Sequence, residues 1–114
     1  MTGGGTAGQE KVAIQSVQYD NNAAAEGLVI WAKSTGGGEV IVDGAILKDS
    51  GGNTVEVLTD DVSGGPLDAA GTLTEIDVDL SGLAAQPADG TYTVTLTSTN
   101  GGSFVSSSFK IIAP

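Results

Sequence analysis

The chain contains no cysteine, no histidine and no arginine, and these absences exclude several kinds of chemistry together. Without cysteine there are no disulfides, no thiolate nucleophiles and no cysteine-bound metal. Without histidine there is neither a Ser-His-Asp arrangement nor an imidazole general base. We therefore assign no catalytic residue and no cofactor-binding residue, and we predict that the protein is not an enzyme.

Positive charge is scarce as well. Fourteen acidic residues stand against four lysines, which gives a formal net charge of −10. Such a surface repels phosphate backbones and anionic lipids, so we expect no nucleic-acid partner. An apolar run of about 18 residues, the length that a membrane-spanning helix needs, is also missing. Attachment to a membrane would therefore have to use a segment absent from this chain.

The residues that are present favour strands. Aromatic residues make up only 4% of the chain, so its core has to be built mainly from Val, Ile, Leu and Ala. Val, Ile and the abundant Thr favour strands, and 18 glycines indicate many turns. The glycine-rich start, residues 1–8, is typical of a flexible linker or a remnant of expression. Residues 9–114 then form a single domain.

Apolar and polar residues alternate with period two through most of this domain, as they do in half-buried strands. The last hairpin, residues 90–112, is the clearest case, because Tyr92, Val94 and Leu96 alternate with threonines before an Asn-Gly-Gly turn. A break in phase at Gly44 predicts a bulge. The earlier strands are predicted at residues 10–19, 26–33, 39–48, 54–58 (with Val55 and Val57 inward) and 72–80, with a long loop over residues 59–71.

About seven short strands with regular turn signals predict an all-β fold, an immunoglobulin-like antiparallel β-sandwich. Two aromatic residues receive structural roles in it. Tyr92 follows Asp89-Gly90 in the layout of a tyrosine corner, a motif in which the tyrosine hydroxyl forms a hydrogen bond with the backbone a few residues upstream. The alternative interpretation is that Tyr92 is only a large core side chain. Trp31 is interpreted as a core residue rather than a ligand platform.

Carboxylates supply only weak candidates for a site. Asp60 and Asp61 with Asp68, or Asp49 with Asn53, would gather oxygen atoms for calcium in glycine-rich loops, although turn and cap roles explain the same residues. We therefore expect no resident cofactor, with calcium the alternative. The acids of residues 75–79 alternate along one strand and are interpreted as a solvated acidic stripe.

Two stretches resemble archaeal type IV pilins and archaellins. Residues 27–55, GLVIWAKSTGGGEVIVDGAILKDSGGNTV, combine an apolar strand, a glycine-rich turn, a Val/Ile strand and a second turn, and residues 90–105, GTYTVTLTSTNGGSFV, are similar to the final hairpin of these proteins. The resemblance implies a β-sandwich head carried on an N-terminal hydrophobic helix. The present chain departs from that pattern, because it has neither the helix nor the glycosylation sequons of heavily glycosylated members.

The resemblance leads to an expected function at the cell surface. The first hypothesis is a structural head domain of an archaeal pilin-like extracellular filament or adhesion appendage, with protein partners through self-assembly. The alternative is a binding module. It is either an archaellum accessory domain that docks onto the surface-layer protein, since the chain resembles those accessory domains as well, or an immunoglobulin-like adhesin.

Overall fold

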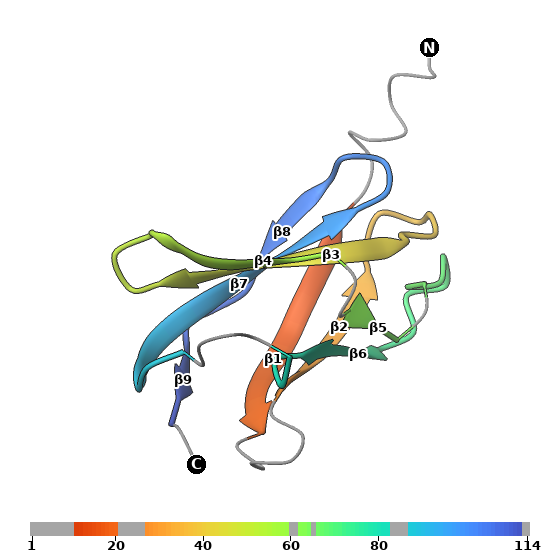
Figure 1. Ribbon diagram of the computed structural model, residues 1–114. Helices are drawn as coiled ribbons and strands as arrows, with labels where there is room; N and C mark the ends of the chain where they lie inside the picture. The colour runs from red at the N-terminus through yellow and green to blue at the C-terminus, as the bar shows by residue number, and fades with distance from the viewer. Residues whose placement is uncertain (1–10, 21–26, 60–61, 65, 83–86, 113–114) are drawn as a thin grey trace.

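The computed structural model describes residues 11–20, 27–59, 62–64, 66–82 and 87–112, and within them the chain is all-β (Figure 1). Two antiparallel sheets pack against each other. The four-stranded sheet has the order β1-β2-β6-β5, and the five-stranded sheet has the order β4-β3-β7-β8, with β9 also paired to β7. The strands are β1 (Val12–Asp20), β2 (Gly27–Ser34), β3 (Val42–Asp49), β4 (Thr54–Leu58), β5 (Val62–Ser63), β6 (Thr74–Asp79), β7 (Gly90–Ser98), β8 (Ser103–Val105) and β9 (Phe109–Ile111).

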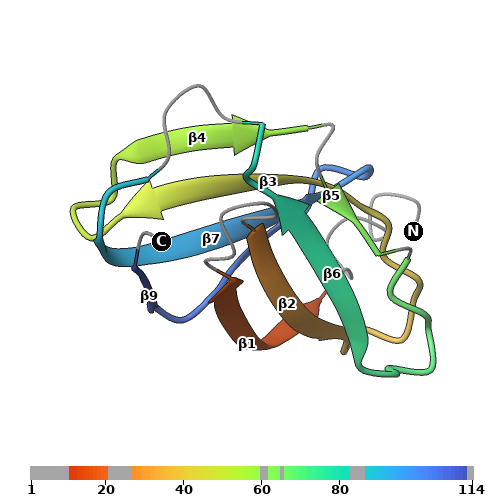
Figure 2. The same cartoon turned by 60° about the horizontal axis from the view of Figure 1, so that its bottom comes forward.

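The chain passes repeatedly from one sheet to the other. The pairs β1–β2, β3–β4 and β7–β8 lie within one sheet, whereas the connections β2–β3 and β6–β7 cross between the sheets. Figure 2 shows the β4, β3 and β7 layer above the β1, β2 and β6 layer, whose strands run across it. The predicted two-layer β architecture is therefore present.

The core lies between the sheets and is aliphatic apart from Tyr92. Alternate positions of β2, β6 and β7 are nearly inaccessible to water, and in β6 and β7 these are the predicted inward residues. Apolar side chains on one face of each sheet can leave water only by facing another sheet, and this burial is the main stabilising term. The core comprises Leu28, Ile30, Ala32, Val40, Ala45, Leu47, Leu58, Leu67, Ile76, Val78, Leu80, Tyr92, Val94, Leu96 and Ile111.

Two bulges change which side chains face inward. In β1 the pairing with β2 shifts between Ile14 and Ser16, so that Val17 and Tyr19 join Ile14 against the core. In β3 the pairing with β7 shifts between Val42 and Gly44, which confirms the predicted bulge. A Cβ at Gly44 would lie 2.6 Å from Thr97 Oγ1, so glycine allows this close approach.

The predicted inward direction of Val55 and Val57 is wrong. Both side chains are exposed, and the buried residue of β4 is Leu58. The pairing with β3 sets Leu58 and Glu56 opposite the inward-facing Ala45 and Leu47, so Val57, between them, faces outward. A register shift between Leu47 and Lys48 then leaves Val55 without a partner in β3. The alternation of residues in β4 correctly separated its two faces, but the prediction placed the core on the wrong face.

The strand number is nine in the described residues, rather than about seven, for two reasons. The predicted loop contains the short strand β5, which pairs with β6, and Leu67, which is fully buried and bridges to Val40. The predicted final strand is divided into β8 and β9 at residues 106–108. Both features depend on contacts with distant segments.

Candidate functional site

The calcium candidates are partly outside the described residues, because Asp60 and Asp61 lie there. Asp68 belongs to a turn: its Oδ1 accepts the N–H of Thr72 at 3.2 Å, and its carbonyl accepts the N–H of Gly71 at 3.1 Å. Among the residues that the structure describes, no group of three or more acidic, His or Cys side chains could hold a metal ion. The geometry of Asp68 is that of a turn residue.

The other candidate pair, Asp49 and Asn53, forms the turn between β3 and β4. Asp49 Oδ1 accepts the N–H groups of Asn53 at 3.0 Å and of Gly51 at 2.9 Å. These hydrogen bonds lower the pKa of Asp49, and the bond from the Asn53 N–H has the largest effect. Because the ionised carboxylate is the better acceptor, the turn is stabilised above the ordinary pKa of aspartate, and this contribution is lost as the pH falls through the lowered pKa.

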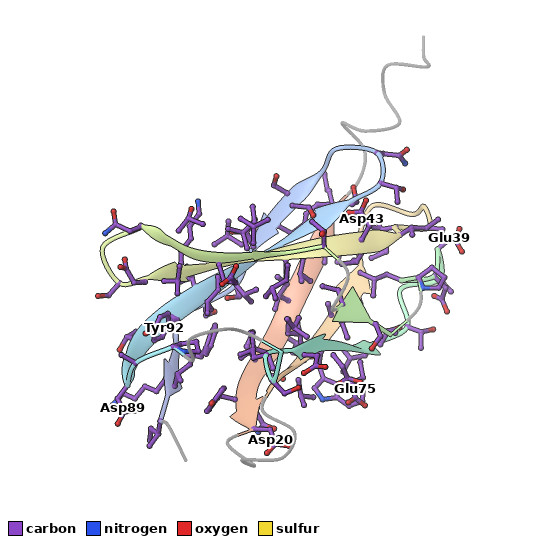
Figure 3. All side chains as sticks on the ribbon, viewed as in Figure 1. Asp20, Glu39, Asp43, Glu75, Asp89 and Tyr92 are labelled. Carbon is purple, nitrogen blue, oxygen red and sulfur yellow. The ribbon has the colours of Figure 1, made fainter. Side chains whose placement is uncertain are left out.

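Tyr92 has the geometry of a tyrosine corner. Its ring is buried, and its Oη donates a hydrogen bond of 2.6 Å to the carbonyl of Ala88, four residues upstream. Figure 3 shows Tyr92 beside the start of β7, close to Asp89. The bond ties the crossing segment to the first strand that it enters.

We expect the Tyr92→Phe variant to lower the free energy of unfolding by about 1 kcal/mol, because the ring stays and only this hydrogen bond is lost. Urea unfolding followed by the fluorescence of Trp31, the single tryptophan, measures the change. A variant with an unchanged midpoint would show that the hydroxyl contributes nothing to stability.

Trp31 lies on the outer face of the four-stranded sheet, partly buried, and not in the core as expected. It faces outward because its neighbours Ile30 and Ala32 face inward. Across the sheet it stands in register between Ser16 of β1 and Glu75 of β6. The next row on this face contains Gln18, Val29, Asp77 and Ser63.

Carboxylates dominate this outer face. Asp20 and Glu75 both lie on the side of the four-stranded sheet that is turned away from the five-stranded sheet (Figure 3). A hydrogen bond with the Asp77 carboxyl, and then its charge, raise the pKa of Glu75, whereas hydrogen bonds from Ser81 lower the pKa of Asp79. The predicted acidic stripe is therefore present, and two of its members repel each other.

The outer face of the five-stranded sheet carries a different set of side chains. Four residues stand in register across four strands: Val57, Ile46, Thr95 and Val105. Val57 and Val105 are 55% and 66% exposed, whereas Thr95 is only 6% exposed. Thr95 Oγ1 is the only buried side-chain oxygen or nitrogen without a hydrogen-bond partner in the described part of the chain. We call these four residues the apolar row.

Two lysines accompany the apolar row. Lys48 pairs with Thr93 and Lys110 with Thr91, so the two ammonium groups flank the first half of β7. One carboxylate reaches the same face at its edge, where Asp43 accepts a long hydrogen bond of 3.4 Å from Thr97. Sequence reasoning missed this row, because its members come from four strands; the available signal was apolar residues out of phase with the core.

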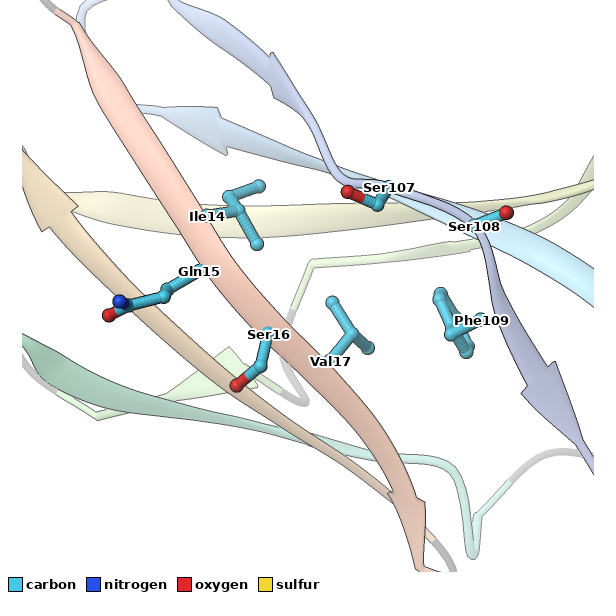
Figure 4. A pocket seen from close by; sticks show the side chains of 7 residues that line it. All are labelled: Ile14, Gln15, Ser16, Val17, Ser107, Ser108 and Phe109. Atoms are coloured by element: carbon cyan, nitrogen blue, oxygen red, sulfur yellow. The ribbon is translucent and has the colours of Figure 1, made fainter.

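A hollow of about 240 Å³ lies between the edges of the two sheets. Ile14 and Val17 of β1 approach it from one side, and Ser107 and Phe109 from the other (Figure 4). None of its seven lining side chains titrates near neutral pH, so the lining offers hydroxyl, amide and apolar contacts. It suits an extended polypeptide better than an ionic ligand.

The far side of this hollow is formed by the bulge at residues 106–108. Ser106 donates its N–H to the carbonyl of Val94 at 2.8 Å, and its Oγ accepts the N–H of Val94 at 3.0 Å. The side chain of Ser106 thus replaces a backbone partner. Pairing with β7 resumes at Phe109, opposite Tyr92, in a register shifted by one residue. The serines therefore form a bulge between β8 and β9.

Comparison of the sequence with family models and with curated proteins finds no match. No helix that could cross a membrane occurs in the ranges that the structure describes.

Proposed function

We propose that this chain is the structural head domain of an archaeal pilin-like extracellular filament or adhesion appendage. The observation that supports the proposal best is the apolar row. Its three aliphatic members, Val57, Ile46 and Val105, come from three strands and lie on one outer face. Apolar side chains left in water are unfavourable unless another surface covers them, and such patches mark interaction surfaces. A subunit surrounded by neighbours in a filament covers such a face. The archaeal and pilin-like parts of the proposal rest on the sequence resemblance.

The proposal includes an immunoglobulin-like sandwich. If β8 and β9 count as one strand interrupted by the serine bulge, and if the two-residue β5 is set aside, seven strands remain. The bond from Tyr92 to Ala88 is consistent with that class of sandwich. Acidic outer strands suit a domain that stays dispersed until assembly.

Immunogold labelling tests the proposed function. Antibodies raised against the 114-residue chain are applied to intact cells of the organism that produces it. We expect gold particles along surface filaments, and loss of labelled filaments when the gene is deleted. Labelling confined to the cell interior, or filaments that persist unchanged after deletion, would contradict the proposal.

The hollow between β1 and the serine bulge supports a second candidate, a binding module at the cell surface. In this function an extended segment of surface-layer protein would lie along the edge of β1. The Ser107→Arg variant fills the hollow, because the Ser107 side chain points toward β1 (Figure 4), and Glu39→Lys changes an exposed loop residue as a control. Binding of purified surface-layer protein that Ser107→Arg abolishes and the control keeps would favour this function over the filament head. Absence of binding would exclude it.

A further inference from the structure

The two outer faces of the sandwich have opposite charge. Among the described residues, the outer face of the four-stranded sheet holds four carboxylates and one lysine: Asp20, Glu75, Asp77, Asp79 and Lys33. The outer face of the five-stranded sheet holds Lys48 and Lys110 against the single carboxylate of Asp43. In a chain of net charge −10, the few lysines of the described strands thus favour one face.

Each face also carries apolar side chains beside its charged residues. Trp31 and Val29 lie on β2, an inner strand of the acidic face, opposite Glu75 and Asp77. The apolar row crosses the basic face beside Lys48. Apolar side chains surrounded by complementary charges are the usual composition of a protein interface.

Neither face is satisfied in the isolated subunit. Glu75 and Asp77 lie two positions apart on the exposed face of β6, where a hydrogen bond with the Asp77 carboxyl, and then its charge, raise the pKa of Glu75. A cation placed beside the two carboxyl groups would favour their ionised forms. On the other face Val57 and Val105 are more than half exposed in the row that holds the buried Thr95. Exposed valines on one face and neighbouring carboxylates on the other are features that a second molecule can cover.

We propose that copies of this chain stack with the acidic outer face of one on the basic outer face of the next, Lys48 meeting Glu75 and Asp77. The inference rests on the proposed filament function. Like faces disfavour each other, because they bring together carboxylates or lysines. An interface between two different faces leaves one free face of each kind on every assembly, so the stack stays open and grows.

Charge exchange between the two faces tests this arrangement with the full chain. Sedimentation velocity and light scattering measure association of the wild type, Lys48→Glu, Glu75→Lys and the double variant. Glu39→Lys is the matched control, since it makes the same change in net charge as Glu75→Lys on an exposed loop. Circular dichroism checks that every variant keeps its β structure. All substituted side chains reach solvent, so folding is preserved.

We expect Lys48→Glu and Glu75→Lys to weaken association by about tenfold or more. An equimolar mixture of the two variants and the double variant should both recover it, because the reversed faces match each other. Glu39→Lys should associate at least as well as the wild type, since it lowers the overall repulsion.

Two results would overturn the inference: a wild-type chain that stays monomeric up to about 1 mM, or Glu75→Lys associating as well as Glu39→Lys. Either result is separable from failure of the filament proposal. Labelled surface filaments together with a monomeric wild-type chain would leave the proposed function standing and remove only the face-to-face stacking.

Discussion

Replacing Leu58 with alanine is expected to lower the free energy of unfolding by about 2–5 kcal/mol. Leu58 is the last residue of β4 and only 2% exposed, and it belongs to the core between the sheets. Truncation removes its buried methyl groups and leaves a cavity that surrounding strands fill only in part. Urea unfolding followed by tryptophan fluorescence and by circular dichroism measures the change.

Val57→Ala is the matched control for Leu58→Ala, because the two residues are neighbours on the same edge strand. Val57 is more than half exposed, so its truncation should cost less than about 1 kcal/mol. The simple alternation of β4 predicts the reverse order of the two effects. A larger loss for Val57→Ala than for Leu58→Ala would show that the register of β4 on β3 differs from the one described.

Replacing Gly64 with alanine is expected to cost about 3 kcal/mol or more. Gly64 follows β5 and has a backbone φ of 132°, a value that residues other than glycine rarely adopt. A Cβ there would lie 2.4 Å from the carbonyl oxygen of Glu75 and 2.8 Å from Ile76 Cα. Since these are backbone atoms of β6, the clash can be relieved only by moving β5 away and exposing Val62.

Gly52→Ala separates the clash from the backbone conformation. Gly52 has a positive φ of 83°, but nothing lies within 4 Å of a Cβ placed on it. Its substitution should therefore cost only the left-handed conformation, about 1–2 kcal/mol. Equal midpoints for the two variants in urea would contradict the close packing of β5 on β6.

The difference between the two outer faces connects the fold to the proposed function. A sandwich that merely had to remain dispersed needs net charge and no large apolar patch, but no difference between its two faces. Here the four-stranded sheet has most of the strand carboxylates, whereas the five-stranded sheet presents threonines, valines and two lysines. Because the two outer faces differ, copies of the chain can join head to tail, the type of contact that builds an open filament.

The pattern of residues was sufficient for the strongly alternating strands. In β6 and β7, the side chains predicted inward are the buried ones, and Gly44 lies at a bulge as predicted. The hydrogen bond from Tyr92 to Ala88 also follows the spacing read from the chain. These features depend on local alternation and turn chemistry, which neighbouring residues determine.

Tertiary structure alone decided which of two faces is covered. Alternation shows which residues of β2 lie on the same face as Trp31, and which residues of β4 lie on the same face as Val57. Only the packing of the two sheets shows that each of these faces points outward. The burial of Leu67 inside a predicted loop likewise depends on its bridge to Val40. The apolar row and the lysines beside it exist only through the register of strands far apart in the chain. The sequence by itself therefore determined the strands and most of the core, whereas contacts between distant strands determined the surfaces that other molecules meet.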